Sequence, residues 1–252
     1  MRLLVINPNI STSVSDLIEA EARRAAADDT QITMLTAQFG VAYIETRFES
    51  LIAGYATSIL AAEHAPAHDA VIVAAFGDPG VTGLREALDI PVVGMTEAAL
   101  MSACLLGQRF SIIAISSRIT AWYRENVERN GLISRLASIR NLESPLRDIG
   151  SVQEDHAEKL IALCNDAVEH DHADSIILAG APLAGLARRV RDQLPVPVVD
   201  GVSSAVCHAQ TLARLAPVGA SKGSFARPPV KPNAGLPEPI VRLLGRQPAG
   251  NR

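Results

Sequence analysis

Small polar side chains gather in loops that follow predicted β-strands. Residues 7–13 (NPNISTS) come directly after the apolar run Leu3–Ile6. A hydroxyl from Ser11 can cap the helix that follows, and side chains such as Asn9 and Thr12 can bind an anionic or polar ligand at a helix N-terminus. Since one loop can serve both purposes, capping and ligand contact both stay open for this segment.

A second loop, Phe76-Gly77-Asp78-Pro79-Gly80, follows the continuously apolar run 70–75. Its glycines and proline allow a sharp turn that presents backbone N–H groups to a ligand. We favour a capping role for Asp78 over that of a catalytic carboxylate, with the second role left open. Thr96, at the start of the next predicted helix and expected to cap it, and Ser116, which follows a later strand, are further candidates for ligand contact.

The segment Tyr43-Ile44-Glu45-Thr46-Arg47 places a phenol, a carboxylate and a guanidinium within five residues. Such a set suits recognition of a polar ring, or it forms a solvated surface turn. A carboxylate that is partly desolvated in a cleft can have a raised pKa and act as a general base. Tyr43, Glu45 and Asp78 are therefore the candidates for acid/base catalysis.

Short β-branched runs alternate with longer helical patterns, which is typical of a parallel-sheet α/β protein. The predicted strands are Leu3–Ile6, Gln31–Thr36, Ala70–Ala75, Pro91–Val93, Ser111–Ile115, Ser138–Arg140, Ser175–Leu178 and Pro197–Val199. The predicted helices are Ser13–Ala27, Glu49–Ala65, Thr82–Leu88, Glu97–Leu106, Ile119–Asn130, Gln153–Glu169, Leu183–Gln193 and Val202–Leu215. After them, Ala216–Arg252 is rich in proline and predicts an extended, surface-wrapping tail with a short helix at Pro239–Leu244.

The chain also repeats itself. The run that begins at Asp69 matches the run that begins at Asp174, 105 residues later, and the two following Pro-Val-Val strands are 106 residues apart. Arg2-Leu-Leu-Val-Ile similarly matches Arg109-Phe-Ser-Ile-Ile, at a spacing of 107 residues. Three aligned segments at nearly one spacing favour a duplicated half over the general likeness of any two βαβ units.

Composition excludes several classes of protein. A net charge of −4 leaves no electrostatic footprint for nucleic acid, and no apolar run is long enough to span a membrane. Three scattered cysteines favour neither a zinc site nor a disulfide framework, and no histidine spacing predicts a metal site. We expect a cytoplasmic protein with a small-molecule substrate or ligand, and neither a metal nor a cofactor.

Six motifs follow one another along essentially the whole chain: Ile6-Asn7-Pro8-Asn9, Tyr43-Ile44-Glu45, Phe76-Gly77-Asp78-Pro79-Gly80, Gly94-Met95-Thr96-Glu97-Ala98, Asp200-Gly201-Val202 and Ser221-Lys222-Gly223-Ser224-Phe225. This series resembles the hydantoin and allantoin racemases of the aspartate/glutamate racemase superfamily. The resemblance implies two pseudo-symmetric, flavodoxin-like α/β halves with the active-site cleft between them. We expect one half to comprise residues 1–94 plus about 200–252, and the other residues 95–199.

The resemblance also implies chemistry without a cofactor, in which one cysteine from each half flanks the substrate carbon. One thiolate removes the α-proton, and the other thiol returns a proton from the opposite face. The positions implied for these cysteines hold Ala75 and Gly180, and neither side chain can carry a proton. Cys104, Cys164 and Cys207 fall within predicted helices instead.

The sequence therefore leaves two functions open. The first is an isomerase that acts on a small hydantoin, ureide or amino-acid-derived substrate with non-thiol acid/base groups. The alternative is a non-catalytic small-ligand-binding protein, or a lyase or decarboxylase on the same scaffold. The resemblance further implies a homo-oligomer. The residues expected to contact the substrate are Asn9, Ser11, Thr12, Tyr43, Ala75, Phe76, Gly77, Thr96, Ser116, Gly180 and Ala181.

Overall fold

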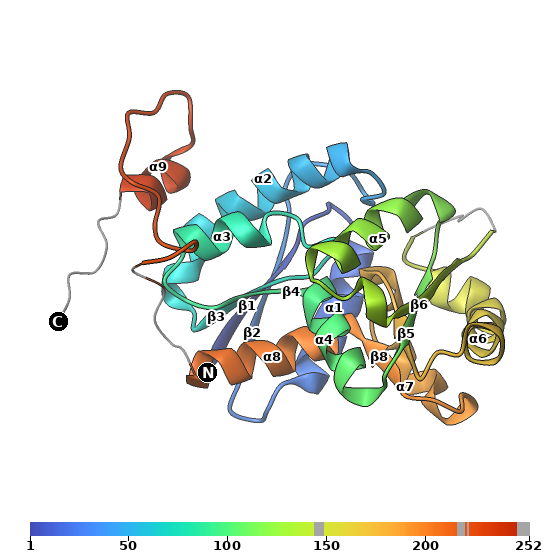
Figure 1. The fold of residues 1–252 in the computed structure, drawn as a ribbon. Helices are drawn as coiled ribbons and strands as arrows, with labels where there is room; N and C mark the ends of the chain where they lie inside the picture. The colour runs from blue at the N-terminus through green and yellow to red at the C-terminus, as the bar shows by residue number, and fades with distance from the viewer. Residues whose placement is uncertain (144–148, 216–219, 221, 246–252) are drawn as a thin grey trace.

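Two four-stranded parallel sheets form the framework of the protein (Figure 1). The computed structural model describes residues 1–143, 149–215, 220 and 222–245. The strand orders are β2-β1-β3-β4 and β6-β5-β7-β8, so the first strand of each half lies between its second and third. This order is that of flavodoxin-like sheets. The predicted α/β fold with two pseudo-symmetric halves is confirmed.

Strands and helices alternate along the chain. The strands are β1 (Arg2–Asn7), β2 (Gln31–Thr36), β3 (Ala70–Val73), β4 (Val92–Gly94), β5 (Phe110–Ala114), β6 (Leu136–Asn141), β7 (Ser175–Leu178) and β8 (Val198–Asp200). The α-helices are α1 (Thr12–Ala25), α2 (Arg47–His64), α3 (Val81–Ala87), α4 (Met95–Leu106), α5 (Thr120–Arg129), α6 (Val152–Asp171), α7 (Leu186–Val190), α8 (Gly201–Leu215) and α9 (Glu238–Gly245). No helix among the described residues is long and apolar enough to cross a membrane.

One predicted helix is wrong. The sequence predicts a continuous helix over Leu183–Gln193, whereas the chain forms a 3-10 turn at Ala181–Leu183, then α7, then a second 3-10 turn at Arg191–Gln193. Gly185 stands directly before α7 with φ at 80°. Because this left-handed conformation cannot be part of a right-handed helix, the helix begins only after it.

Backbone hydrogen bonds show that the repeat is structural. The Arg2 N–H donates to the Asp69 carboxylate at 2.7 Å, and the Arg109 N–H donates to the Asp174 carboxylate at 2.8 Å. In each pair the aspartate N–H donates back to the arginine carbonyl, at 2.8 Å in both halves. The sequence matches thus mark equivalent places at the starts of β1 and β3 and of β5 and β7.

The core has a shared central layer and two outer layers. Leu3 and Val5 face a large cluster that includes Ile112 and Ile177 of the second sheet, whereas Leu4 and Ile6 face a separate cluster beneath α2 and α3. This alternation follows from the two-residue period of a strand. One central cluster therefore joins both sheets and fixes the halves against each other.

Two helices follow the fourth strand of their own sheet and pack on the other sheet. Helix α4 contacts β7 and β8, while α8 contacts β3 and β4 and also lies against α4. Figure 1 shows α8 running along the first sheet. We propose the domain division 1–94 plus about 200–252 and 95–199, and this exchange of helices supports it.

The predicted short helix in the tail is confirmed as α9 (Glu238–Gly245), which packs against α2. Leu243 of α9 is buried in the outer core cluster of the first half, together with Leu60 and Leu84. The tail thus returns to the surface of the first half. Residues 216–219, 221 and 246–252 of the predicted tail lie outside the described residues.

Candidate functional site

Ala75 and Gly180 occupy equivalent places in the two halves. Each lies two residues beyond the end of its strand, β3 or β7. The residue before Ala75 donates its N–H to the Ile6 carbonyl at 2.8 Å, and the residue before Gly180 donates to the Ile113 carbonyl at 2.9 Å. Since ligands of open parallel sheets bind beyond the carboxyl ends of the strands, both positions lie where a ligand site is expected.

The two positions differ in backbone conformation. Gly180 has φ at 110°, a value that residues with a side chain rarely adopt, whereas Ala75 is not among the residues with positive φ. The Ala75 side chain is buried, as is Ala181, which follows Gly180 and begins the 3-10 turn. A proton-carrying side chain could therefore stand at position 75 without backbone strain, but not at position 180.

The loop after β3 is held by the second half of the molecule. The Phe76 ring packs against the Tyr123 ring of α5 with 4.6 Å between centroids. Gly77 has φ at 113°, and a Cβ atom there would lie 2.2 Å from Cζ2 of Trp122. Trp122 and Tyr123 were not predicted as site residues. Their signal in the sequence is an aromatic pair just after the fifth strand, in a chain with only 4% aromatic residues.

Thr96 does not cap α4, contrary to the prediction. The N-cap is Gly94, and Thr96 is the second residue of the helix. Its hydroxyl instead accepts a hydrogen bond from the Gly77 N–H at 2.5 Å. Thr96 therefore joins α4 to the loop after β3, because the fold brings the two segments together beside neighbouring strands.

Asp78 performs the capping role that Thr96 lacks. Its Oδ1 accepts from the Thr96 N–H at 2.8 Å, and its Oδ2 accepts from the Glu97 N–H at 2.9 Å. Burial raises the pKa of the Asp78 carboxyl to about 7, with a further contribution from the Glu97 charge, although the backbone donors lower it. Both carboxyl oxygens thus bind the N-terminus of α4, while the carboxyl titrates in the range of a general base.

The second half contains a related carboxyl at the corresponding junction. Asp200 is the last residue of β8 and accepts from the Gly185 N–H at 2.6 Å and from the Ser203 N–H at 2.9 Å. In the first half the equivalent position is Gly94, where a Cβ atom would lie 2.3 Å from Cγ of Asp78. Each half therefore places one carboxyl between its third and fourth strand ends. The first half supplies it from the loop after β3, and the second supplies it from the last residue of β8.

The loop after β1 is stabilised by its own asparagines. The fully buried Asn7 amide donates to Asn9 Oδ1 at 3.1 Å, to the Ser11 carbonyl at 3.1 Å and to the Ser15 hydroxyl at 2.9 Å. Ser11 is the N-cap of α1, and Thr12 is exposed at the first helical residue. Asn7 was not predicted as a site residue, although its buried amide fixes the position of the predicted contacts Asn9 and Ser11.

Tyr43 comes from the first half but packs against the core cluster of the second. Its hydroxyl is buried and has no hydrogen-bond partner among the described residues. Burial raises the pKa of the Tyr43 phenol, and the charges of Glu45 and Glu49 raise it further. The phenol is therefore protonated at neutral pH and can donate a hydrogen bond. A buried hydroxyl without a partner costs free energy, and a ligand that supplied an acceptor would remove this cost.

The two other predicted site residues, Glu45 and Ser116, make local contacts. Glu45 is half-buried, and its backbone N–H donates to the Glu49 carboxylate at 2.8 Å. Arg47, two residues on, forms an ion pair with Glu125 of α5 and thereby links the two halves. Ser116, after β5, is half-buried and accepts from the Arg118 N–H at 3.3 Å.

We expect Tyr43→Phe to stabilise the free protein and to weaken ligand binding. Removing a buried hydroxyl that has no partner should raise the free energy of unfolding by about 1 kcal/mol. If the hydroxyl donates to a bound ligand, the same change should raise the ligand Kd by about tenfold. Urea unfolding and calorimetric titration with allantoin measure the two effects, and an unchanged Kd would show that Tyr43 does not contact the ligand.

Known proteins resemble this chain over nearly its full length. A family model described as Asp/Glu/Hydantoin racemase matches residues 3–209. The hydantoin racemase of Paenarthrobacter aurescens is 34% identical over 238 residues, which cover 92% of this chain and 99% of that protein.

The solved structures agree with the sequence comparison. The allantoin racemase of Pseudomonas fluorescens is 34% identical with a TM-score of 0.84, covering 93% of this chain and 100% of that one. The allantoin racemase of Klebsiella pneumoniae is 31% identical with a TM-score of 0.89, covering 93% and 96%. The resemblance inferred from the loop motifs is therefore confirmed, and the chain belongs to the Asp/Glu/hydantoin racemase family.

Proposed function

We propose that this protein is a cofactor-independent isomerase that inverts a stereocentre in a small hydantoin or ureide. The observation that carries the proposal is the match to hydantoin and allantoin racemases along almost the entire chain, in sequence and in fold. The substrate would bind between the two halves, at the loops that follow β1, β3, β5 and β7. Contacts of Phe76 and Gly77 with α5 support this placement, because they hold the loop after β3 against the second half.

Inversion needs one group that removes the α-proton and one that returns a proton from the opposite face. With Ala75 and Gly180 at the positions implied for the family cysteines, these groups are not thiols from the strand ends. Glu45 is our candidate for the base and Tyr43 for the acid, since the buried Tyr43 hydroxyl carries a proton and has no hydrogen-bond partner among the described residues. Asp78 is the second candidate for the base, because its pKa is raised to about 7.

Hydrogen exchange in D2O tests this proposal directly. Single enantiomers of allantoin and of 5-substituted hydantoins are incubated with the protein. The α-proton signal is followed by NMR, and the loss of optical activity is followed by circular dichroism. These substrates also exchange and racemise slowly in buffer without protein. Exchange and loss of optical activity that are faster than this background support an isomerase. Binding of these compounds without exchange above that background would contradict it.

A second candidate is a protein that binds such a ligand without converting it. The positive φ of Gly180 favours this alternative, since no proton-carrying side chain fits there without strain. A thermal-shift screen distinguishes the two functions. A stabilising ligand that is recovered with unchanged optical rotation and without deuterium identifies a binder.

We expect the two strand-end positions to respond differently to cysteine. Ala75→Cys should leave the free energy of unfolding within about 1 kcal/mol, because it adds one atom at a site with ordinary backbone geometry. Gly180→Cys should lower it by about 1–3 kcal/mol, because φ is 110° at that residue. Urea unfolding of both variants measures this difference. Equal stabilities would mean that segment 180–185 readily adopts another backbone conformation.

We further propose a homo-oligomer in the cytoplasm. Phe48, Leu51 and Tyr55 are exposed on one face of α2, with the spacing of a single helical stripe. Such an apolar stripe supports association between copies, which light scattering of the purified protein measures. The three cysteines are free and form no disulfide, which suits a reducing compartment.

A further inference from the structure

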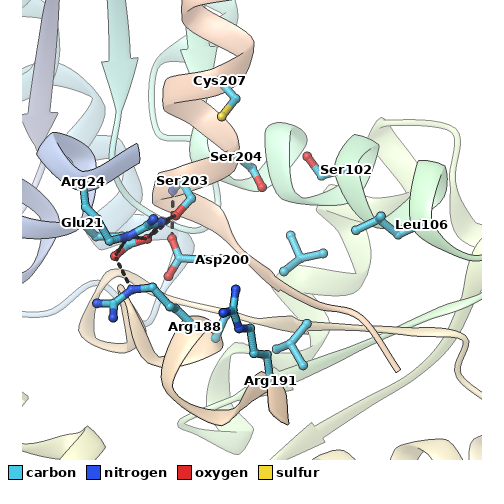
Figure 2. A pocket seen from close by; sticks show the side chains of 13 residues that line it. Glu21, Arg24, Ser102, Leu106, Arg188, Arg191, Asp200, Ser203, Ser204 and Cys207 are labelled. Atoms are coloured by element: carbon cyan, nitrogen blue, oxygen red, sulfur yellow. Dashed lines mark hydrogen bonds and ion pairs between the residues drawn. The ribbon is translucent and has the colours of Figure 1, made fainter. Parts of the chain in front are cut away.

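A pocket of about 320 Å³ lies where α1 of the first half meets α4, α7, β8 and α8 (Figure 2). Its lining contains none of the residues expected to contact the substrate. The lining residues that matter for its chemistry are three arginines, two acids and an exposed thiol: Arg24, Arg188, Arg191, Glu21, Asp200 and Cys207. The pocket is therefore a cavity with its own polar groups, separate in composition from the candidate active site.

The two acids of this pocket are already engaged by the protein. The Glu21 side chain is only 4% exposed and is bound by the Arg24 guanidinium and the Ser203 hydroxyl. Asp200 binds the backbone N–H groups of Gly185 and Ser203. Burial raises the pKa of Asp200 above its ordinary value. Three arginines line the pocket beside these two acids. Positive charge therefore exceeds negative charge in the pocket.

Two of the arginines have only weak partners. Arg188 lies 3.9 Å from Glu21, and Arg191 lies 3.6 Å from Asp192, which is itself 91% exposed. Figure 2 shows both arginines entering from the same side of the pocket, with Leu106 on the opposite side. Ala187, Val198 and Leu106 provide an apolar part of the lining. Two guanidinium groups beside an apolar wall suit a carboxylate that carries a short hydrocarbon chain.

We propose that this pocket is a second ligand site, which binds a small aliphatic carboxylate through Arg188 and Arg191 with the hydrocarbon chain against Leu106 and Val198. A carboxylate offers two coplanar oxygens to the N–H groups of a guanidinium. The site does not depend on the proposed racemase activity. The pocket is connected to the candidate active site through Asp200. This residue lines the pocket and accepts a hydrogen bond from Gly185, which follows Gly180 by five residues.

The exposed Cys207 thiol in the lining provides a direct assay. The full-length protein is treated with iodoacetamide, and alkylation of Cys207 is measured by peptide mass spectrometry with butyrate, butyramide or inorganic phosphate present. We expect butyrate to slow alkylation of Cys207 and to raise the melting temperature, whereas neutral butyramide of nearly the same shape does neither. Cys104, which does not line the pocket, serves as the internal reference.

A pair of charge-matched variants completes the test. Arg191→Gln removes a guanidinium of the site and should weaken butyrate protection about tenfold or more. Arg242→Gln on α9 removes the same charge from an arginine of similar exposure, 62% against 67%, and should leave protection unchanged. Equal protection in both variants, protection by butyramide, or no protection in the wild type would overturn the proposal. Stronger protection by phosphate would overturn its assignment to a carboxylate.

Discussion

Gly77→Ala is expected to lower the free energy of unfolding by about 3–5 kcal/mol. A Cβ atom at this position would lie 2.2 Å from Cζ2 of Trp122, well inside van der Waals contact. The residue also has φ at 113°, which is strained for any residue with a side chain. Overpacking and backbone strain each cost about 1–3 kcal/mol, and here they act together. Urea unfolding of the variant measures the sum.

Gly131 offers a control for a positive φ without a steric clash. Its φ is 71°, and apart from the residue itself and its chain neighbours, no atom of the described residues lies within 4 Å of the position that a Cβ atom would take. Gly131→Ala should therefore cost only about 1 kcal/mol. A double-mutant cycle of Gly77→Ala with Trp122→Ala should show a favourable coupling, because the clash disappears with the indole. If both glycine variants lose the same stability, the contact between Gly77 and Trp122 is not a constraint.

The contact between Gly77 and Trp122 also matters for function, because it joins the two halves. Gly77 belongs to the loop after β3, and Trp122 belongs to α5 of the second half. A loop displaced by the clash would move away from the loops of the second half. We therefore expect Gly77→Ala to impair ligand binding more strongly than Gly131→Ala does, even under conditions where both variants are folded.

The second large effect is a pH dependence of stability caused by Asp78. Its pKa is about 7 in the folded protein, against 3.8 as the ordinary value. Between these values the folded state binds a proton that the unfolded state does not, so stability falls as pH rises. The slope from this group is about −1.4 kcal/mol per pH unit, and the total loss between pH 4 and pH 7 is at most about 4 kcal/mol.

Asp78→Asn isolates this contribution. Asparagine has nearly the same shape and tolerates the positive φ of 51° at this position, but it does not titrate. Unfolding by urea at several pH values should show a shallower slope for the variant than for the wild type between pH 4 and 7. Glu21, Asp171 and Asp200 also have shifted pKa values, the first two lowered and the third raised. They titrate in both the wild type and the variant, so the difference between the two slopes belongs to Asp78. Identical slopes would show that Asp78 is not the titrating group.

Local patterns in the sequence were enough to predict most elements, their order and the family. Strand positions followed from continuous apolar runs such as Ala70–Val73, because buried parallel strands leave a local pattern. The repeat between Asp69 and Asp174 predicted two similar halves, since equivalent residues in a duplicated fold keep one spacing. The helix predicted over Leu183–Gln193 was wrong, because the apolar pattern of this segment does not reveal the left-handed backbone of Gly185.

The partners of each candidate side chain depend on contacts between distant segments. The Asp78 carboxyl, for which the sequence favours a capping role, caps α4, and the Thr96 hydroxyl accepts from the Gly77 N–H. The Tyr43 hydroxyl is buried and has no acceptor within the part of the chain that the structure describes, and Gly180 has a backbone that excludes a strain-free cysteine. Each result depends on contacts or φ angles set by segments distant in the chain. A motif fixes which groups are present near a strand end, whereas packing fixes their partners, protonation and access to a ligand.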